Sequence, residues 1–169
     1  MSHAVVRTDN MFGTDVRAGL VSAKYFVSTT ETEIDNGNVV KLDSLITGER
    51  EVFKAVAPAA NSALNEVVLV ATPEVMYDER LRNLDDYYNI AGKIIRCYRL
   101  HTGDAFGVTK DGLDGAATPA VGDVVELKAG TKLNVKAAAT GATDGSTVVG
   151  KIEAIETAGR YTYYVIRVA

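Results

Sequence analysis

The second half of the chain alternates short β-rich runs with glycine-containing turns, and this pattern limits the fold more than any other feature. Residues 94–100 form a β-rich run that ends at a Thr-Gly-Asp turn, and residues 105–109 form the next run. The same order recurs in residues 121–135, where a Gly-Asp pair opens a strand and Ala-Gly-Thr closes a hairpin. Short strands separated by such turns are typical of antiparallel sandwiches and small barrels.

Strand signals elsewhere support the same fold class. The expected strands are rich in β-branched and aromatic residues and cover residues 23–28, 39–42, 49–56, 66–71, 93–100, 105–109, 123–128, 132–137, 148–156 and 161–168. Only residues 74–88 show the spacing of apolar side chains that indicates a helix, and Asn83 is placed to cap it. We therefore predict a mainly β fold, an antiparallel β-sandwich or small β-barrel with one short helix and an N-terminal arm.

The composition is sufficient for a buried core. The chain has 169 residues and is 47% hydrophobic, so we expect no metal or organic cofactor to be needed for folding. The predicted core residues are Ile94, Tyr98, Leu100, Phe106, Val125, Leu127, Val135, Ile152, Tyr164 and Ile166. Cys97 is the one cysteine, and its apolar neighbours predict a buried, structural thiol.

The first 20 residues lack a regular pattern, so we predict an arm over residues 1–20 and a β-rich domain over residues 21–169, with a candidate sub-boundary near 72–90. The arm nevertheless carries apolar side chains, which a solvated tail would lack. We predict that it packs on a partner through Met11, Phe12, Val16 and Leu20, with Met11 and Phe12 as anchors. The alternative is that the arm folds back onto its own domain.

Candidates for nucleophilic or metal chemistry are few. Cys97 and His101 are four residues apart on an expected strand, which separates them by roughly 13 Å, too far to share a metal ion. His101 and Asp104 flank a turn and are close enough to touch, but a thiol in mid-strand lacks the setting that lowers its pKa. We therefore predict that the chain is not an enzyme. A small enzyme built on these three residues is the alternative.

Two groups of carboxylates are further candidates. Glu31, Glu33 and Asp35 alternate along an extended run, so they share one face that could bind calcium or perform acid–base chemistry. Asp85 and Asp86 form the second group. The simpler interpretation of both groups is a solvated surface.

Net charge and hydropathy limit the kinds of partner that the chain is expected to bind. The formal net charge of -4 and the sequence pI of about 5.2 disfavour a surface for nucleic-acid phosphates. The longest apolar run is far shorter than the roughly 20 residues of a membrane span. The N-terminus lacks the basic and apolar regions of a signal peptide, so we expect synthesis in the cytoplasm.

The turn and strand motifs resemble those of a known family. The match covers the run from residue 91 to residue 109, whose core residues are Leu100, Gly103, Asp104, Phe106, Val108 and Thr109, and it includes Val121, Gly122 and Asp123, with residues 71–74 and Tyr77 upstream. They resemble small virion proteins encoded near the major capsid gene of tailed bacteriophages, the capsid decoration or cement proteins. The resemblance covers residues 67–168, and its motifs carry no individual functional residue.

The resemblance implies a structural virion protein that binds the outer surface of the major capsid protein and stabilises an icosahedral shell. It implies a homo-oligomer on the capsid exterior, made in the host cytoplasm, without nucleic acid, membrane or cofactor as partner. The alternative is a β-barrel binding module for nucleic acid or carbohydrate, which the low pI disfavours for nucleic acid.

Overall fold

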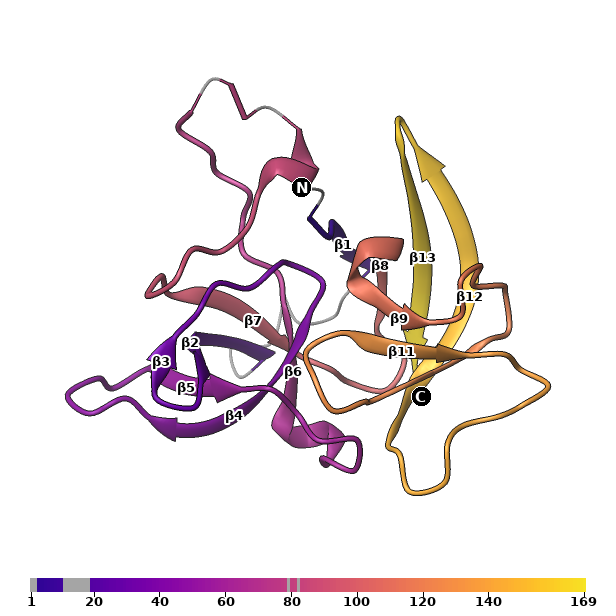
Figure 1. Ribbon diagram of the computed structural model, residues 1–169, viewed down its shortest axis with the longest axis horizontal. Helices are drawn as coiled ribbons and strands as arrows, with labels where there is room; N and C mark the ends of the chain where they lie inside the picture. The colour runs from indigo at the N-terminus through magenta and orange to yellow at the C-terminus, as the bar shows by residue number, and fades with distance from the viewer. Residues whose placement is uncertain (1–2, 11–18, 79, 82) are drawn as a thin grey trace.

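The computed structural model describes residues 3–10, 19–78, 80–81 and 83–169, and two β-sheets organise them (Figure 1). The seven strands of the first sheet are, in spatial order, β1 (Val6–Asn10), β8 (Ala105–Thr109), β13 (Tyr161–Val168), β12 (Val148–Ala158), β10 (Val124–Glu126), β11 (Leu133–Lys136) and β9 (Leu113–Gly115). The six strands of the second are β3 (Thr30–Glu31), β2 (Leu20–Val27), β5 (Val52–Val56), β4 (Val39–Leu45), β6 (Val67–Val70) and β7 (Ile95–Arg99).

The second sheet closes on itself. Because β2 pairs with β7 as well as with β5, the five strands β2, β5, β4, β6 and β7 form a closed barrel. The first sheet is an open, curled sheet that packs beside this barrel. The fold is therefore mainly β, as predicted. Most pairings are antiparallel, but β2 runs parallel to β5 and β11 runs parallel to β9.

Two hydrophobic cores fill the fold. One lies inside the barrel and includes Val68, Val70 and Cys97. The other lies between barrel and curled sheet, and it includes Val67 and Leu69 together with side chains of the curled sheet. Alternate residues of β6 thus enter different cores, which explains why this strand is a continuous apolar run.

The predicted core is confirmed at most positions. Ile94 is an exception, because it is 47% exposed while Ile95 is buried in the barrel. Ile94 lies just before β7, which begins at Ile95, so its side chain is outside the paired strand. Tyr164 is only partly buried and packs against the core between the sheets. The remaining predicted core residues are buried.

The N-terminal segment contributes a strand. β1 pairs with β8 at the edge of the curled sheet, and Ala4, Val5 and Val6 are buried. The Val5 N–H donates to the Thr109 Oγ1 at 3.0 Å, and the Thr109 N–H donates to the Val5 carbonyl at 2.9 Å. This part of the expected arm therefore folds back onto its own domain.

The residues proposed as arm contacts have different fates. Met11, Phe12 and Val16 lie outside the described residues. Leu20 opens β2, where it pairs with Tyr98 of β7 and is 39% exposed. Leu20 thus belongs to the barrel wall rather than to an arm.

The helix expected over residues 74–88 is reduced to one short turn. Within the described part of this segment, the helical element is the 3-10 turn η4 (Leu84–Asp86). Asn83 does precede it as the N-cap, and its N–H donates to Asp86 Oδ2 at 3.1 Å. Leu81 and Leu84 are exposed, so two of the three side chains of the expected apolar stripe are not packed, and packing is what stabilises most protein helices.

The repeated Gly-Asp motif builds the same turn twice. In the first turn, the His101 N–H donates to Asp104 Oδ2 at 2.9 Å; in the second, the Ala120 N–H donates to Asp123 Oδ2 at 2.9 Å. The glycine before each aspartate has a φ near +90°, a conformation that disfavours other residues. The motif therefore sets the start of β8 and of β10.

Burial of the N-terminal residues leads to the first prediction. Val5→Ala should lower the free energy of unfolding by about 1–3 kcal/mol, because it opens a cavity at a side chain that is only 3% exposed. Val27→Ala, at a position 54% exposed, is the matched control and should change it by less than about 0.5 kcal/mol. Urea unfolding measures both. Equal stability of Val5→Ala and the wild type would contradict the burial of this segment.

Candidate functional site

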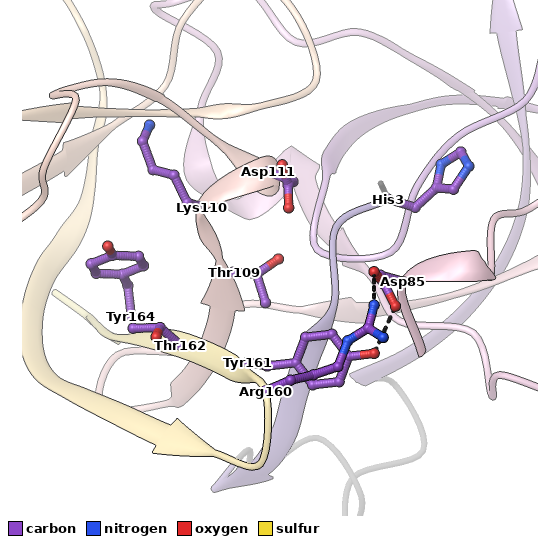
Figure 2. A pocket seen from close by; sticks show the side chains of 9 residues that line it. All are labelled: His3, Asp85, Thr109, Lys110, Asp111, Arg160, Tyr161, Thr162 and Tyr164. Atoms are coloured by element: carbon purple, nitrogen blue, oxygen red, sulfur yellow. Dashed lines mark hydrogen bonds and ion pairs between the residues drawn. The ribbon is translucent and has the colours of Figure 1, made fainter. Parts of the chain in front are cut away.

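A cleft of about 310 Å³ opens where the N-terminal residues, η4, the turn η5 (Lys110–Gly112) and the β12–β13 ribbon meet (Figure 2). Its lining is polar and carries charges of both signs. The lining residues are His3, Asp85, Thr109, Lys110, Asp111, Arg160, Tyr161, Thr162 and Tyr164. Of these, Asp85 was among the carboxylates singled out in the sequence.

Asp85 ties η4 to the β-ribbon. The Tyr161 hydroxyl donates to Asp85 Oδ1 at 2.7 Å, and the Arg160 guanidinium forms an ion pair with Oδ2 of the same carboxylate. Figure 2 shows both groups turned toward the carboxylate. Arg160 also lies over the Tyr161 ring, 5.1 Å from its centroid. These contacts join segments that are about 75 residues apart in sequence.

The electrostatics of this cluster favour fixed charge states. The hydrogen bond from Tyr161, together with Arg160, lowers the pKa of the Asp85 carboxyl below its usual value. Burial, and then the bond to Asp85, raises the pKa of the Tyr161 hydroxyl. Asp85 is therefore an anion at neutral pH, and Tyr161 remains its hydrogen-bond donor.

His3 extends this network to a further loop. Its Nδ1 lies 2.8 Å from Asp35 Oδ1, and its ring stacks on Tyr88 with centroids 4.9 Å apart. The His3 N–H also donates to the Asp85 carbonyl at 3.0 Å. Asp35 is thus engaged by His3, and Glu31 likewise pairs with Lys24 Nζ at 3.1 Å.

On the opposite side of the cleft, Lys110 also makes a contact that stabilises the fold. Lys110 Nζ donates to the Leu113 carbonyl at 2.9 Å, which closes the turn after β8. Lys110 and Arg160 balance the carboxylates of Asp85 and Asp111 around the opening. Among the residues that the structure describes, no group of three or more His, Cys, Asp and Glu side chains could hold a metal ion.

The proposed catalytic candidates do not meet in one accessible site. Cys97 is fully buried inside the barrel, and burial strongly raises the pKa of its thiol. His101 is exposed in a turn, and Asp104 is buried with its carboxylate bonded to the His101 N–H. The sequence correctly predicted that His101 and Asp104 flank the same turn. The Asp104 carboxylate, however, accepts the backbone N–H of His101 and not its imidazole ring.

Two polar centres were missed by the sequence reasoning. Buried Glu126 accepts the Thr143 N–H at 2.6 Å, the Thr143 hydroxyl at 2.8 Å and the Asn134 amide at 2.7 Å. Burial opposes ionisation of Glu126, but these hydrogen bonds outweigh it, so its pKa lies below the usual value. Buried Asn36, the second centre, hydrogen-bonds Thr72 through both its amide and its carbonyl.

Comparison with known proteins adds no assignment, because no family model, curated protein or solved structure matches this chain. Within the described ranges, no helix is long and apolar enough to cross a membrane.

Burial of Cys97 predicts that its thiol reacts slowly in the native protein. A maleimide or aromatic disulfide reagent should label native Cys97 far more slowly than it labels the protein in denaturant, because the thiolate is disfavoured and the sulfur is covered. Time-resolved labelling followed by mass spectrometry measures this rate. Native and denatured rates of similar size would contradict the barrel core.

The lowered pKa of Asp85 predicts a pH-dependent contribution to stability. A depressed carboxyl pKa stabilises the fold fully above the unfolded value of about 3.9, and this stabilisation is lost as the pH falls through the lower folded value. Asp85→Asn should therefore lower the melting temperature at pH 7, and the difference from wild type should shrink in acid.

Asp144→Asn is the matched control, since it removes the same charge from an exposed loop and should have little effect at either pH. Thermal unfolding followed by circular dichroism from pH 7 downward measures the series. A difference between Asp85→Asn and wild type that stays constant with pH would argue against the cluster.

Proposed function

We propose that this chain is a structural virion protein that decorates an icosahedral phage capsid, binding the outer surface of the major capsid protein as a homo-oligomer. The observation that carries this proposal is the structural role of the aspartates in the two turn motifs. Asp104 and Asp123, which belong to the turn motifs that resemble those of decoration proteins, are both buried and both bond to backbone N–H groups. These residues hold turns of the β frame, as a structural role requires.

Such a frame suits decoration. Cement proteins act through many copies, each of which buries a modest area on a repeating lattice, so that repetition multiplies a weak contact. The unit must keep its shape under load. Closure of the barrel removes most free strand edges from this half of the chain, and edges are where sheets slip or aggregate.

The cleft supports a second candidate, a binding module for carbohydrate. Its charges are balanced, and its lining includes the hydroxyls of Thr109, Tyr161 and Tyr164. A neutral, hydroxyl-rich ligand fits such a lining better than a nucleic-acid phosphate, which needs unpaired cations.

Cosedimentation with shells tests the proposal. The purified chain is mixed with undecorated shells of a candidate cognate major capsid protein, and shells of an unrelated phage serve as control. We expect saturable binding at a fixed ratio to the cognate capsid protein and a higher melting temperature of the shell. The proposal fails if the chain stays in the supernatant, and binding to a panel of oligosaccharides in that case favours the second candidate.

A further inference from the structure

A second crevice, of about 480 Å³, lies where the barrel meets the curled sheet. The barrel side contributes Tyr25 of β2 and residues of the loop 32–38, and the curled sheet contributes Thr131 and Lys132 from the turn between β10 and β11. This loop and this turn lie side by side (Figure 1). Sites for small ligands usually enclose roughly 300–1,000 Å³ and often occur where two parts of a fold meet. The crevice is thus large enough for one small ligand.

Backbone hydrogen bonds fix the walls of the crevice. The Val39 N–H donates to the Thr131 carbonyl at 2.7 Å, which attaches the turn of the curled sheet to the barrel. On the barrel side, the Thr32 N–H donates to the Tyr25 carbonyl at 3.0 Å. Because the fold itself orders both walls, a ligand loses little affinity to their ordering.

Asn38 is the residue that points to a ligand. It lines the crevice and is only 5% exposed, and its Oδ1 has no hydrogen-bond partner within the described ranges. Burial of a polar atom is costly unless it is hydrogen-bonded, so native folds rarely leave one unsatisfied. The Asn38 carbonyl, by contrast, accepts the Val70 N–H at 2.9 Å. The backbone of Asn38 therefore serves the fold, while its side-chain oxygen suits a ligand that donates a hydrogen bond.

Tyr25 supplies a second unused polar group. The residue is only 9% exposed, and its hydroxyl makes no hydrogen bond among the residues that the structure describes. Burial raises the pKa of this hydroxyl, so it stays protonated at neutral pH and can both donate and accept. Val27 of the same strand also lines the crevice and is 54% exposed, which adds an apolar surface.

The charged groups of the crevice have both signs. Glu33 and Lys132 line it and form no ion pair in the part of the chain that the structure describes, whereas Asp35 is engaged by His3. A phosphate would meet the carboxylates, and a metal ion would meet the Lys132 ammonium. A hydroxyl group can donate to a carboxylate and accept from an ammonium. The lining therefore favours a neutral ligand that is rich in hydroxyls.

We propose that this crevice binds a sugar ring, with Asn38 Oδ1 accepting a hydrogen bond from one sugar hydroxyl and the Tyr25 hydroxyl bonded to another. The ring comes either from a free monosaccharide or from the end of a glycan. A sugar ring has hydroxyls at its edge and C–H groups on its faces, and the faces match the apolar surface of Val27.

The site is distinct from the charged cleft at Asp85. Of the described lining residues, the crevice and that cleft share His3. The inference goes beyond decoration of a capsid, and neither binding event depends on the other.

Titration of the full chain with sugars tests the inference. Isothermal titration calorimetry uses glucose, galactose, mannose and N-acetylglucosamine, and an array that carries the same sugars at the ends of glycans distinguishes the two sources. We expect saturable binding of at least one sugar. A chain that binds none of them in either form overturns the inference. So does a chain that binds free glycine, inorganic phosphate or calcium ions through Asn38 in place of sugars.

Two substitutions locate the site. Asn38→Leu should weaken sugar binding at least tenfold while the melting temperature stays the same or rises, because an apolar group replaces a buried oxygen without a partner. Tyr25→Phe should also weaken binding at least tenfold and leave the fold unchanged. Tyr164→Phe is the matched control, because it removes the same hydroxyl from the cleft at Asp85, and it should bind sugar as the wild type does.

The variants separate the crevice from the cleft. Sugar binding that Asn38→Leu and Tyr25→Phe both retain overturns the assignment to the crevice. Binding that only Tyr164→Phe removes also overturns it and places the sugar in the cleft. If Asn38→Leu does not fold, Tyr25→Phe decides alone. Cosedimentation with shells is a separate measurement, so failure of the sugar site and failure of capsid binding are distinguishable.

Discussion

Burial of both faces of β6 is the constraint on which the rest of the structure depends. Val67 and Leu69 fill the space between the barrel and the curled sheet, while Val68 and Val70 fill the barrel. Each fully buried side chain of this kind contributes about 1.5–3 kcal/mol relative to exposure. Because one strand supplies both cores, the two sheets stabilise each other, and every segment that projects from them is carried by one connected frame.

Polar side chains then fix the segments between strands. A buried carboxylate is costly unless hydrogen bonds replace its water. Asp104, Asp123 and Glu126 each satisfy this requirement through neighbouring N–H groups. Buried Asn36 and Asn89 do the same for the long connection between β6 and β7, since the Asn89 amide donates to Asn36 Oδ1 at 3.1 Å. The irregular parts of the fold are therefore ordered by particular hydrogen bonds.

Strand composition was a good guide to the fold, and tertiary contacts explain what it missed. All the expected strand ranges overlap observed strands, because β-branched runs between turns carry a local signal. The strands that were missed are β1, β3 and β9, and β3 has only two residues. β1 is short and polar beyond Val6, and β9 ends at Gly115, where a Cβ would lie 2.2 Å from the Val135 carbonyl oxygen. Such a close approach becomes visible only once the partner strand is placed.

The candidate site was harder to predict. Asp85 was noticed as an acidic residue, but its partners Arg160 and Tyr161 lie far along the chain, and no local spacing connects them. Residues 74–88 were misread as a helix because the spacing of Leu81 and Leu84 matches one, whereas both side chains are exposed. A periodic apolar stripe indicates a helix only when some other surface covers it.

The order of strands along the chain has a consequence for biosynthesis. β2 to β7 span residues 20–99 without interruption, so the barrel can close while the ribosome is still making the curled sheet. β1 must wait for β8, from which about 100 residues separate it. Until then Val67 and Leu69 face outward from the finished barrel. We therefore expect the nascent chain to pass through an intermediate in which the barrel is closed but one apolar side of it is exposed. Chaperones bind such apolar surfaces, and the strands of the curled sheet later bury this one.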